Sequence, residues 1–183
     1  STATESLKKQ KGTFSELAGV YGFTYDKRNR SFMPTSGSII RFNQTLPIYA
    51  DKAFIGNSVT ARTYKTVSEN VIGAGKLLLQ TVNGLGDEDV RLNKRNFISN
   101  KRLRGFKSGK IGPVDGKDHI GGNYLAAVNF EASLPKLLPE STKTDINLFL
   151  DLGNVWGVDY DSSIDDSNKI RSTAGAAASW ISP

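Results

Sequence analysis

The sequence predicts an all-β chain, an antiparallel up-and-down transmembrane β-barrel of which it holds about seven strands and one long loop. Three observations lead there: apolar residues recur at every second position, the alternating segments run about ten residues or more, and turn-forming residues separate them. Strands of globular proteins average about five or six residues, whereas a tilted strand needs about 9–11 to cross a bilayer. On pattern alone, a soluble β-sandwich binding module is the alternative.

Composition excludes several other classes of protein. The 183 residues include no Cys and one His, His119, which excludes a disulfide scaffold, a thiolate metal site and a multi-histidine site. We therefore expect no metal and no cofactor. The net charge is +6, but Lys and Arg are spread along the chain with one concentration at 91–110, so we expect no nucleic-acid partner. No run approaches the ~20 apolar residues of a membrane helix.

The first four strands are expected before the long loop, at 14–25, 38–49, 54–65 and 71–83. In the first of them, Tyr21, Phe23 and Tyr25 fall on one face. In the fourth, Leu77 and Leu79 fall on one face, and Lys76 and Gln80 fall on the other. The segment 54–65 alternates least clearly, and either of its faces could point outward.

The last three strands are expected at 122–134, 145–156 and 169–181, and the first of these alternates most cleanly. Its apolar row includes Val128 and Phe130, which would face lipid. Period two then places Glu131 on the opposite, inward face, and the same parity places Asp151 inward on the next strand. These two carboxylates stand out as inward charges.

The long polar segment 84–120 separates the fourth and fifth strands, and loops of this length are usually functional or disordered. It contains Leu103-Arg104-Gly105-Phe106, followed by Ile111-Gly112-Pro113. Arg104 offers a planar fork of donors suited to carboxylates, and Gly105 permits a backbone conformation that other residues resist. The plainer interpretation is a solvated basic loop, because further Lys and Arg residues surround the motif.

The two inward carboxylates are expected to be neighbours. If the turn centres on Glu140 or Ser141, Glu131 lies opposite Phe149 or Asp151, so the carboxylates are direct or diagonal neighbours on one face. Two such groups repel unless a cation lies between them, and the long loop offers Arg104. The alternative is that both simply line a wet lumen. A glycosidase interpretation of the pair is rejected, since nothing suggests a sugar cleft or an acid of raised pKa.

The acidic stretch 159–166, DYDSSIDD, suggests calcium at first sight. It lacks the Gly and the terminal Glu of an EF-hand loop. We therefore interpret it as a solvated loop between the last two strands.

Taken together, these motifs resemble a known family. They are the RGF with IGP downstream, GGNYLAAVNFEASLP, FLDLGNVW, IRSTAGAAASWISP and the early TYDKRNRSFMPTSG. In this order they are similar to the barrel domain of BamA-type outer-membrane protein assembly factors, the bacterial surface antigen superfamily, with relatives in two-partner secretion, mitochondria and chloroplasts. The resemblance covers about residues 14–183.

The resemblance implies a role for the loop. Segment 84–120 would be extracellular and fold back into the barrel, where the Arg of the RGF motif docks on acidic residues of the inner wall. Carried over, the docking motif is Arg104, Gly105 and Phe106 with Gly112 and Pro113, and its wall partners are Glu131 and Asp151. The turns around Pro34 and 135–144 would be periplasmic, and 159–168 extracellular.

The resemblance also implies a function. Residues 1–183 would be a C-terminal barrel-domain fragment, without the POTRA domains, the first strands and the last strands. The expected role is the assembly and insertion of β-barrel proteins into the bacterial outer membrane, without enzymatic chemistry. Expected partners are unfolded outer-membrane proteins, assembly-complex lipoproteins and the lipid bilayer. A two-partner-secretion transporter of the same barrel family is the alternative.

Overall fold

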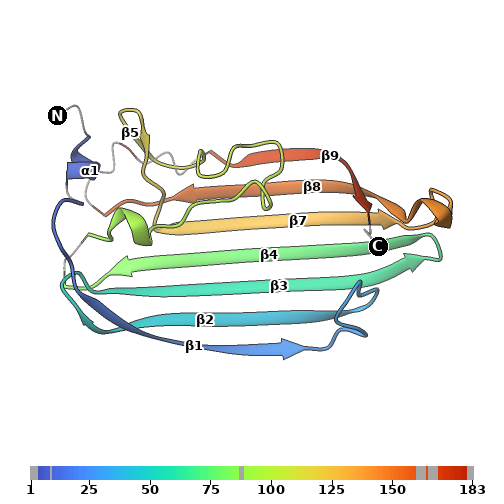
Figure 1. The fold of residues 1–183 in the computed structure, drawn as a ribbon, viewed down its shortest axis with the longest axis horizontal. Helices are drawn as coiled ribbons and strands as arrows, with labels where there is room; N and C mark the ends of the chain where they lie inside the picture. Colours follow the sequence, from blue (N-terminus) through green and yellow to red (C-terminus); the bar gives the residue numbers. More distant parts are fainter. Residues whose placement is uncertain (1–3, 9, 87–88, 160–163, 165–168, 181–183) are drawn as a thin grey trace.

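A seven-stranded antiparallel sheet dominates the computed structural model, which describes residues 4–8, 10–86, 89–159, 164 and 169–180. Its strand order is β1-β2-β3-β4-β7-β8-β9, so β1 and β9 form its edges and each strand follows its sequence neighbour (Figure 1). The strands are β1 (Glu16–Asp26), β2 (Gly37–Ala50), β3 (Phe54–Ser68), β4 (Val71–Gly84), β7 (Tyr124–Leu134), β8 (Thr144–Trp156) and β9 (Arg171–Trp180).

The fold class predicted from the alternation is confirmed, with all seven strands present. Their lengths run from 10 to 15 residues, well above the globular average. The sequence pattern does not predict four shorter features: α1 (Glu5–Lys8), the 3-10 turns Leu92–Lys94 and Glu140–Thr142, and the hairpin of β5 (Val114–Asp115) with β6 (Asp118–His119). Each is too short to carry a periodic pattern. Within the described residues, no helix has the length and apolar character needed to cross a membrane.

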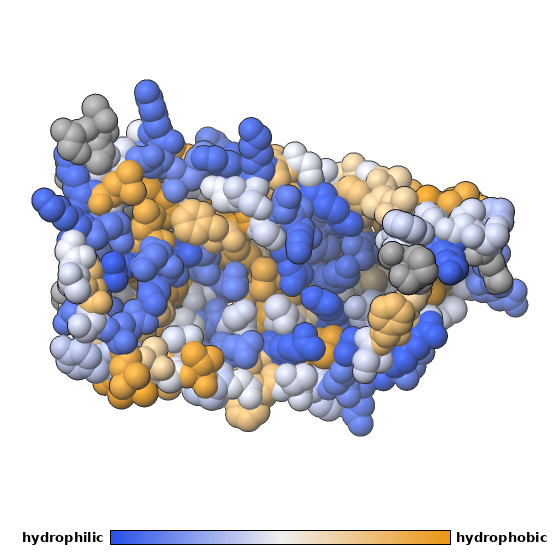
Figure 2. Space-filling model, viewed as in Figure 1, coloured by the Kyte–Doolittle hydropathy of each residue, from blue (hydrophilic) through white to orange (hydrophobic). Residues whose placement is uncertain are grey.

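The two faces of the sheet differ in chemistry, as period two predicts. Residues directly opposite on antiparallel strands share a face, so the register traces rows across the sheet. One row runs through Arg62, Lys76, Asn129 and Asp151. The face bearing this row is called the inner face, and Figure 2 shows hydrophilic side chains gathered over its hollowed middle. The other face exposes large apolar side chains, among them Tyr21, Phe23, Tyr25, Ile40, Phe130, Leu148 and Leu150.

The long loop, residues 85–123, crosses the inner face of β7 and β8 (Figure 1). It packs its own apolar residues against inward side chains of β4, β7 and β8, and this is where the buried core lies. The cluster comprises Ile98, Leu103 and Ile111 of the loop with Leu78, Leu125, Ala127 and Val155 of the strands, and Phe106 packs against it. The approach is close: a Cβ at Gly153 would lie 2.6 Å from Cδ1 of Ile98.

The turn between β1 and β2, expected to be periplasmic, is fixed by its own hydrogen bonds. Oδ1 of Asn29 accepts from the backbone N–H groups of Thr35 and Ser36 at 3.1 and 3.3 Å. Gly37 follows with φ +92°, where a Cβ would lie 2.1 Å from the carbonyl oxygen of Lys27. Glycine is therefore required at this position.

Candidate functional site

Arg104 lies on the inner face of β7 and β8, held there by its neighbours in the loop. Leu103 is 1% exposed, and Gly105 takes φ +83°, a left-handed conformation that favours glycine. Anchoring on one side and a tight turn on the other direct the Arg104 side chain along the sheet.

Asp151 is the main partner of Arg104. Its Oδ2 accepts from Nε of Arg104 at 2.7 Å and from the Arg104 backbone N–H at 3.1 Å, while its Oδ1 accepts from Nη2 at 2.6 Å. This is the parallel, two-bond arrangement that a guanidinium makes with a carboxylate. The Asp151 side chain has no exposed surface, so its charge depends on these donors.

Glu131 shares its carboxylate between two cations. Its Oε1 lies 3.0 Å from Nη1 of Arg104, and its Oε2 accepts from Nζ of Lys76 on β4. Glu131 stands opposite Phe149, so it is a diagonal neighbour of Asp151. The sequence leaves open whether Glu131 lies opposite Phe149 or Asp151, and the register selects Phe149.

Two further residues complete the surroundings of Arg104. The guanidinium carbon lies 3.7 Å from the ring centroid of Phe149, a stacked cation–π contact. Nδ2 of Asn129 donates to Oδ1 of Asp151 at 2.8 Å and to the carbonyl oxygen of Arg102 at 2.7 Å, so it ties the strand to the loop. The hydrogen bond to Asp151 raises the pKa of Arg104 above its ordinary value.

The remaining residues of the sequence motif surround this centre and serve the packing of the loop. Phe106 packs on the apolar cluster, and Pro113 is fully buried. Gly112 has φ +106°, and a Cβ there would lie 2.9 Å from both Cβ and the carbonyl oxygen of Val155. These residues let the loop approach β8 closely.

A second polar cluster lies at the base of the loop. The sequence predicts a solvated loop at Asp159, but its Oδ2 accepts from the backbone N–H of Val90 at 2.7 Å and its Oδ1 accepts from Nδ2 of Asn123. Asp159 therefore joins both stems of the long loop. Most of the remaining acidic stretch, 160–163 and 165–166, lies outside the described residues.

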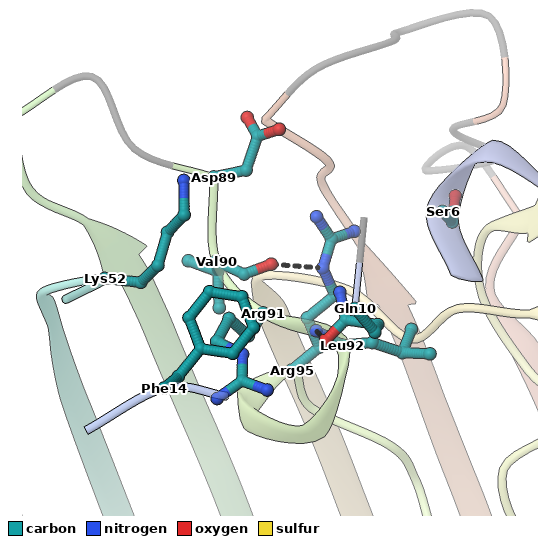
Figure 3. A pocket seen from close by; sticks show the side chains of 9 residues that line it. All are labelled: Ser6, Gln10, Phe14, Lys52, Asp89, Val90, Arg91, Leu92 and Arg95. Carbon is teal, nitrogen blue, oxygen red and sulfur yellow. Dashed lines mark hydrogen bonds between the residues drawn. The ribbon is translucent and has the colours of Figure 1, made fainter. Parts of the chain in front are cut away.

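Arg95 extends this cluster toward a cavity of about 290 Å³ (Figure 3). Its side chain is 1% exposed, its Nε donates to the carbonyl oxygen of Val90 at 3.2 Å, and its Nη2 lies 3.8 Å from Oδ2 of Asp159. Across the cavity, the guanidinium of Arg91 stacks on Phe14 at 3.9 Å. The sequence offers no signal for the pairing of Arg95 with Asp159 or of Arg91 with Phe14, since both pairs are distant along the chain.

No group of three or more His, Cys, Asp or Glu residues in the described parts of the chain could hold a metal ion. The carboxylates of the site are instead balanced by Arg104 and Lys76. The arrangement can hold a loop against a wall, and the contacts of Arg104 join it to carboxylates rather than to a nucleophile.

Comparison with known proteins matches residues 1–183 to the family model of the Omp85 superfamily domain. The outer membrane protein assembly factor BamA of Neorickettsia risticii (strain Illinois) is 29% identical over 99% of this chain and 25% of its own length. The sorting and assembly machinery component 50 homolog of Mus musculus is 23% identical over 87% of this chain and 36% of its own length.

A solved structure agrees in fold. The crystal structure of BamA from Haemophilus ducreyi lacking POTRA domains 1–3 superimposes with a TM-score of 0.79 at 24% identity, covering 90% of this chain and 36% of that chain. The chain thus spans about a quarter to a third of the length of these relatives.

Proposed function

The chain belongs to the Omp85 superfamily, and we propose that it forms part of a barrel that assembles and inserts β-barrel proteins into the bacterial outer membrane. Two relatives, one from a bacterium and one from mouse, have assembly in their names. The partners that follow from this proposal are unfolded outer-membrane proteins, assembly-complex lipoproteins and the bilayer. The role requires binding and positioning rather than covalent chemistry.

The observation that carries the proposal is the pairing of Arg104 with Asp151 and Glu131 on the inner face. In this proposal segment 84–120 is an extracellular loop that folds inward, and Arg104, Gly105, Phe106, Gly112 and Pro113 form its docking motif. The docked loop braces β4, β7 and β8, because it bonds Asp151 of β8 and Asn129 of β7 and packs its apolar residues against Leu78 of β4. A braced wall gives the barrel a rigid side while clients are handled elsewhere.

The test replaces Arg104 by Ala in the full-length protein. Asp151 would then be buried without its cation, which costs roughly 3 kcal/mol. We expect faster protease cleavage of the loop and slower folding of a client barrel into membranes. Arg28→Ala is a matched control, because Arg28 also pairs with a carboxylate but lies in the β1–β2 turn.

Two results would contradict the proposal. Unchanged protease cleavage in the Arg104→Ala variant would remove the docking role. A loop that opens while client folding stays normal would separate docking from assembly, and export of a soluble partner instead of client folding would favour the secretion transporter.

A further inference from the structure

The inner face of β2, β3 and β4 carries more positive charge than its own carboxylates balance. These three strands contain Arg41, Arg62 and Lys76 on that face, and none of them contains Asp or Glu. Arg62 stands opposite both Ile39 and Lys76, and Arg41 stands opposite Thr60, so Arg41 and Arg62 are diagonal neighbours. Lys76 is held by Glu131, which leaves the two arginines as the surplus.

The carboxylates of β1 do not remove this surplus. Asp26 accepts from Nε and Nη2 of Arg28 at 2.9 and 2.7 Å, and Glu16 lies 2.7 Å from Nζ of Lys94. Arg41 lies diagonally across from Asp26 and is within its electrostatic reach, but the charge of Asp26 is already balanced by Arg28, and that of Glu16 by Lys94. The register places the surplus of charge on the inner face of β2 and β3. Figure 2 shows hydrophilic side chains over the hollowed middle of that face.

The docked loop adds one more cation to this wall. The carbonyl oxygen of Arg102 accepts from Asn129, which stands opposite Lys76, and Lys76 stands opposite Arg62. Asn129 and Arg62 are two strand spacings apart, so the backbones of Arg102 and Arg62 lie about 10 Å apart. Two arginine side chains can span that distance. Burial, and then the charge of Arg62, lower the pKa of Arg102 from its ordinary value, which agrees with two neighbouring guanidiniums.

We propose that Arg41, Arg62 and Arg102 form a binding surface on the inner wall for an acidic segment of polypeptide, and that docking of the loop completes it. Guanidinium groups bind carboxylates through two parallel hydrogen bonds, and one carboxylate between Arg62 and Arg102 would relieve their repulsion. The surface faces away from the exposed apolar rows, which favours a polypeptide in the lumen over a lipid headgroup.

Binding and docking are then linked. Because Arg102 is carried by the loop, an acidic ligand binds more tightly to the docked state, and by thermodynamic reciprocity it stabilises docking by the same factor. This inference deepens the proposed function by naming the chemistry of the polypeptide that the wall accepts. It rests on the docked loop and not on assembly activity itself.

The experiment measures binding of a fluorescein-labelled hexaglutamate peptide to the purified protein in micelles of a non-ionic detergent, with labelled hexaglutamine as the neutral comparison. We expect saturable binding of the acidic peptide, weakened by salt, and a loss of roughly tenfold for Arg62→Gln and for Arg102→Gln. Lys65→Gln is the matched control, since Lys65 is exposed on β3 with the opposite parity to Arg62. Circular dichroism confirms that each variant keeps its strands.

Equal binding of hexaglutamine, or equal affinities of the Arg62 and Lys65 variants, would overturn the proposal. The proposal would also be overturned if the protein did not bind hexaglutamate but bound phosphatidylglycerol saturably, and the Arg62 and Arg102 variants weakened that binding. The surface would then be a site for a lipid headgroup. Arg104→Ala supplies the last arm: if proteolysis shows the loop open, peptide binding should fall as in Arg102→Gln. If peptide binding is unchanged although the loop is open, the loop does not complete the surface and this part of the proposal is wrong. Failure of client folding is scored separately and bears only on the proposed function.

Discussion

β7 and β8 lie beneath the long loop, whereas β2 and β3 keep an uncovered inner wall, although both pairs of strands alternate in the same way. Beneath the loop, Leu125, Ala127 and Val155 are at most 2% exposed. In the middle of β2 and β3 the inward positions are polar, for example Asn43 and Thr60, although Ile39 of β2 is buried at 3% exposure. A sheet with apolar side chains outside gains most of its packed interior where another segment covers its inner face.

In the docked loop, the apolar contacts and the ion pairs have different roles. Burying Ile98, Leu103 and Ile111 removes three large side chains from water and contributes roughly 5 kcal/mol together. The Arg104 side chain keeps a quarter of its surface exposed, so its ion pairs contribute less than a dry pair would. Apolar burial therefore holds the loop, while the pairing of Arg104 with Asp151 fixes where it lies.

The largest expected effect on the covered half comes from Asp151→Asn. This change removes the charge from the buried acceptor of three Arg104 hydrogen bonds, and we expect a loss of roughly 3 kcal/mol in loop docking, the upper value for hydrogen bonds to a charged group. Hydrogen exchange of the Arg104 amide, which donates to Asp151, measures the opening. Glu131→Gln is the comparison: the Glu131 side chain is 20% exposed, so its loss should cost about 1 kcal/mol. A larger effect for Glu131 would reverse the ranking of the two carboxylates.

Gly112→Ala should come next, through backbone strain and steric conflict. The added Cβ would press on the Val155 backbone at a positive φ, and we expect about 2 kcal/mol of destabilisation in all, roughly half of it from φ alone. Gly86→Ala isolates that cost, because Gly86 also has a positive φ but a Cβ added there would meet nothing within 4 Å. The rate of protease cleavage of the loop is compared between the two variants, and the excess in Gly112→Ala reports the steric conflict with Val155. Equal sensitivity would show that the loop does not approach β8 this closely.

The smallest effect is expected at the base of the loop, from Asp159→Asn. The variant keeps one acceptor but loses the charge near Arg95, so we expect about 1 kcal/mol and faster exchange of the Val90 amide. The Arg104 amide should exchange as before. Acceleration of both amides by the same factor would mean that the two clusters open together, and the loop would then be one cooperative unit.

Much of the fold follows from alternation. The seven segments predicted from period two coincide with the strands to within a few residues, because each strand separates an apolar face from a polar one. The predicted loop 84–120 begins one residue early and ends three residues early, since β4 ends at Gly84 and β7 begins at Tyr124. The bulge at Leu17/Ala18 carries no sequence signature of its own.

The site is predictable only in part. Parity alone places Glu131 and Asp151 on the inner face, and the family resemblance points to Arg104. Alternation places Lys76 on the polar face but does not pair it with Glu131, because that requires the register between β4 and β7 across a loop of about forty residues. The sequence leaves Asp159 in solvent because its partners Val90 and Asn123 meet only after the loop has folded.

The distribution of the partners of Arg104 also sets the order in which the chain can assemble. Asp151 comes from β8 and Glu131 from β7, and Glu131 is itself held by Lys76 of β4, so the docking position is complete only after these three strands have paired. A slip of one residue between β7 and β8 would turn Asp151 to the opposite face and leave the guanidinium without its carboxylate. Loop closure is thus a late event that reports whether the strands beneath it have paired in the correct register.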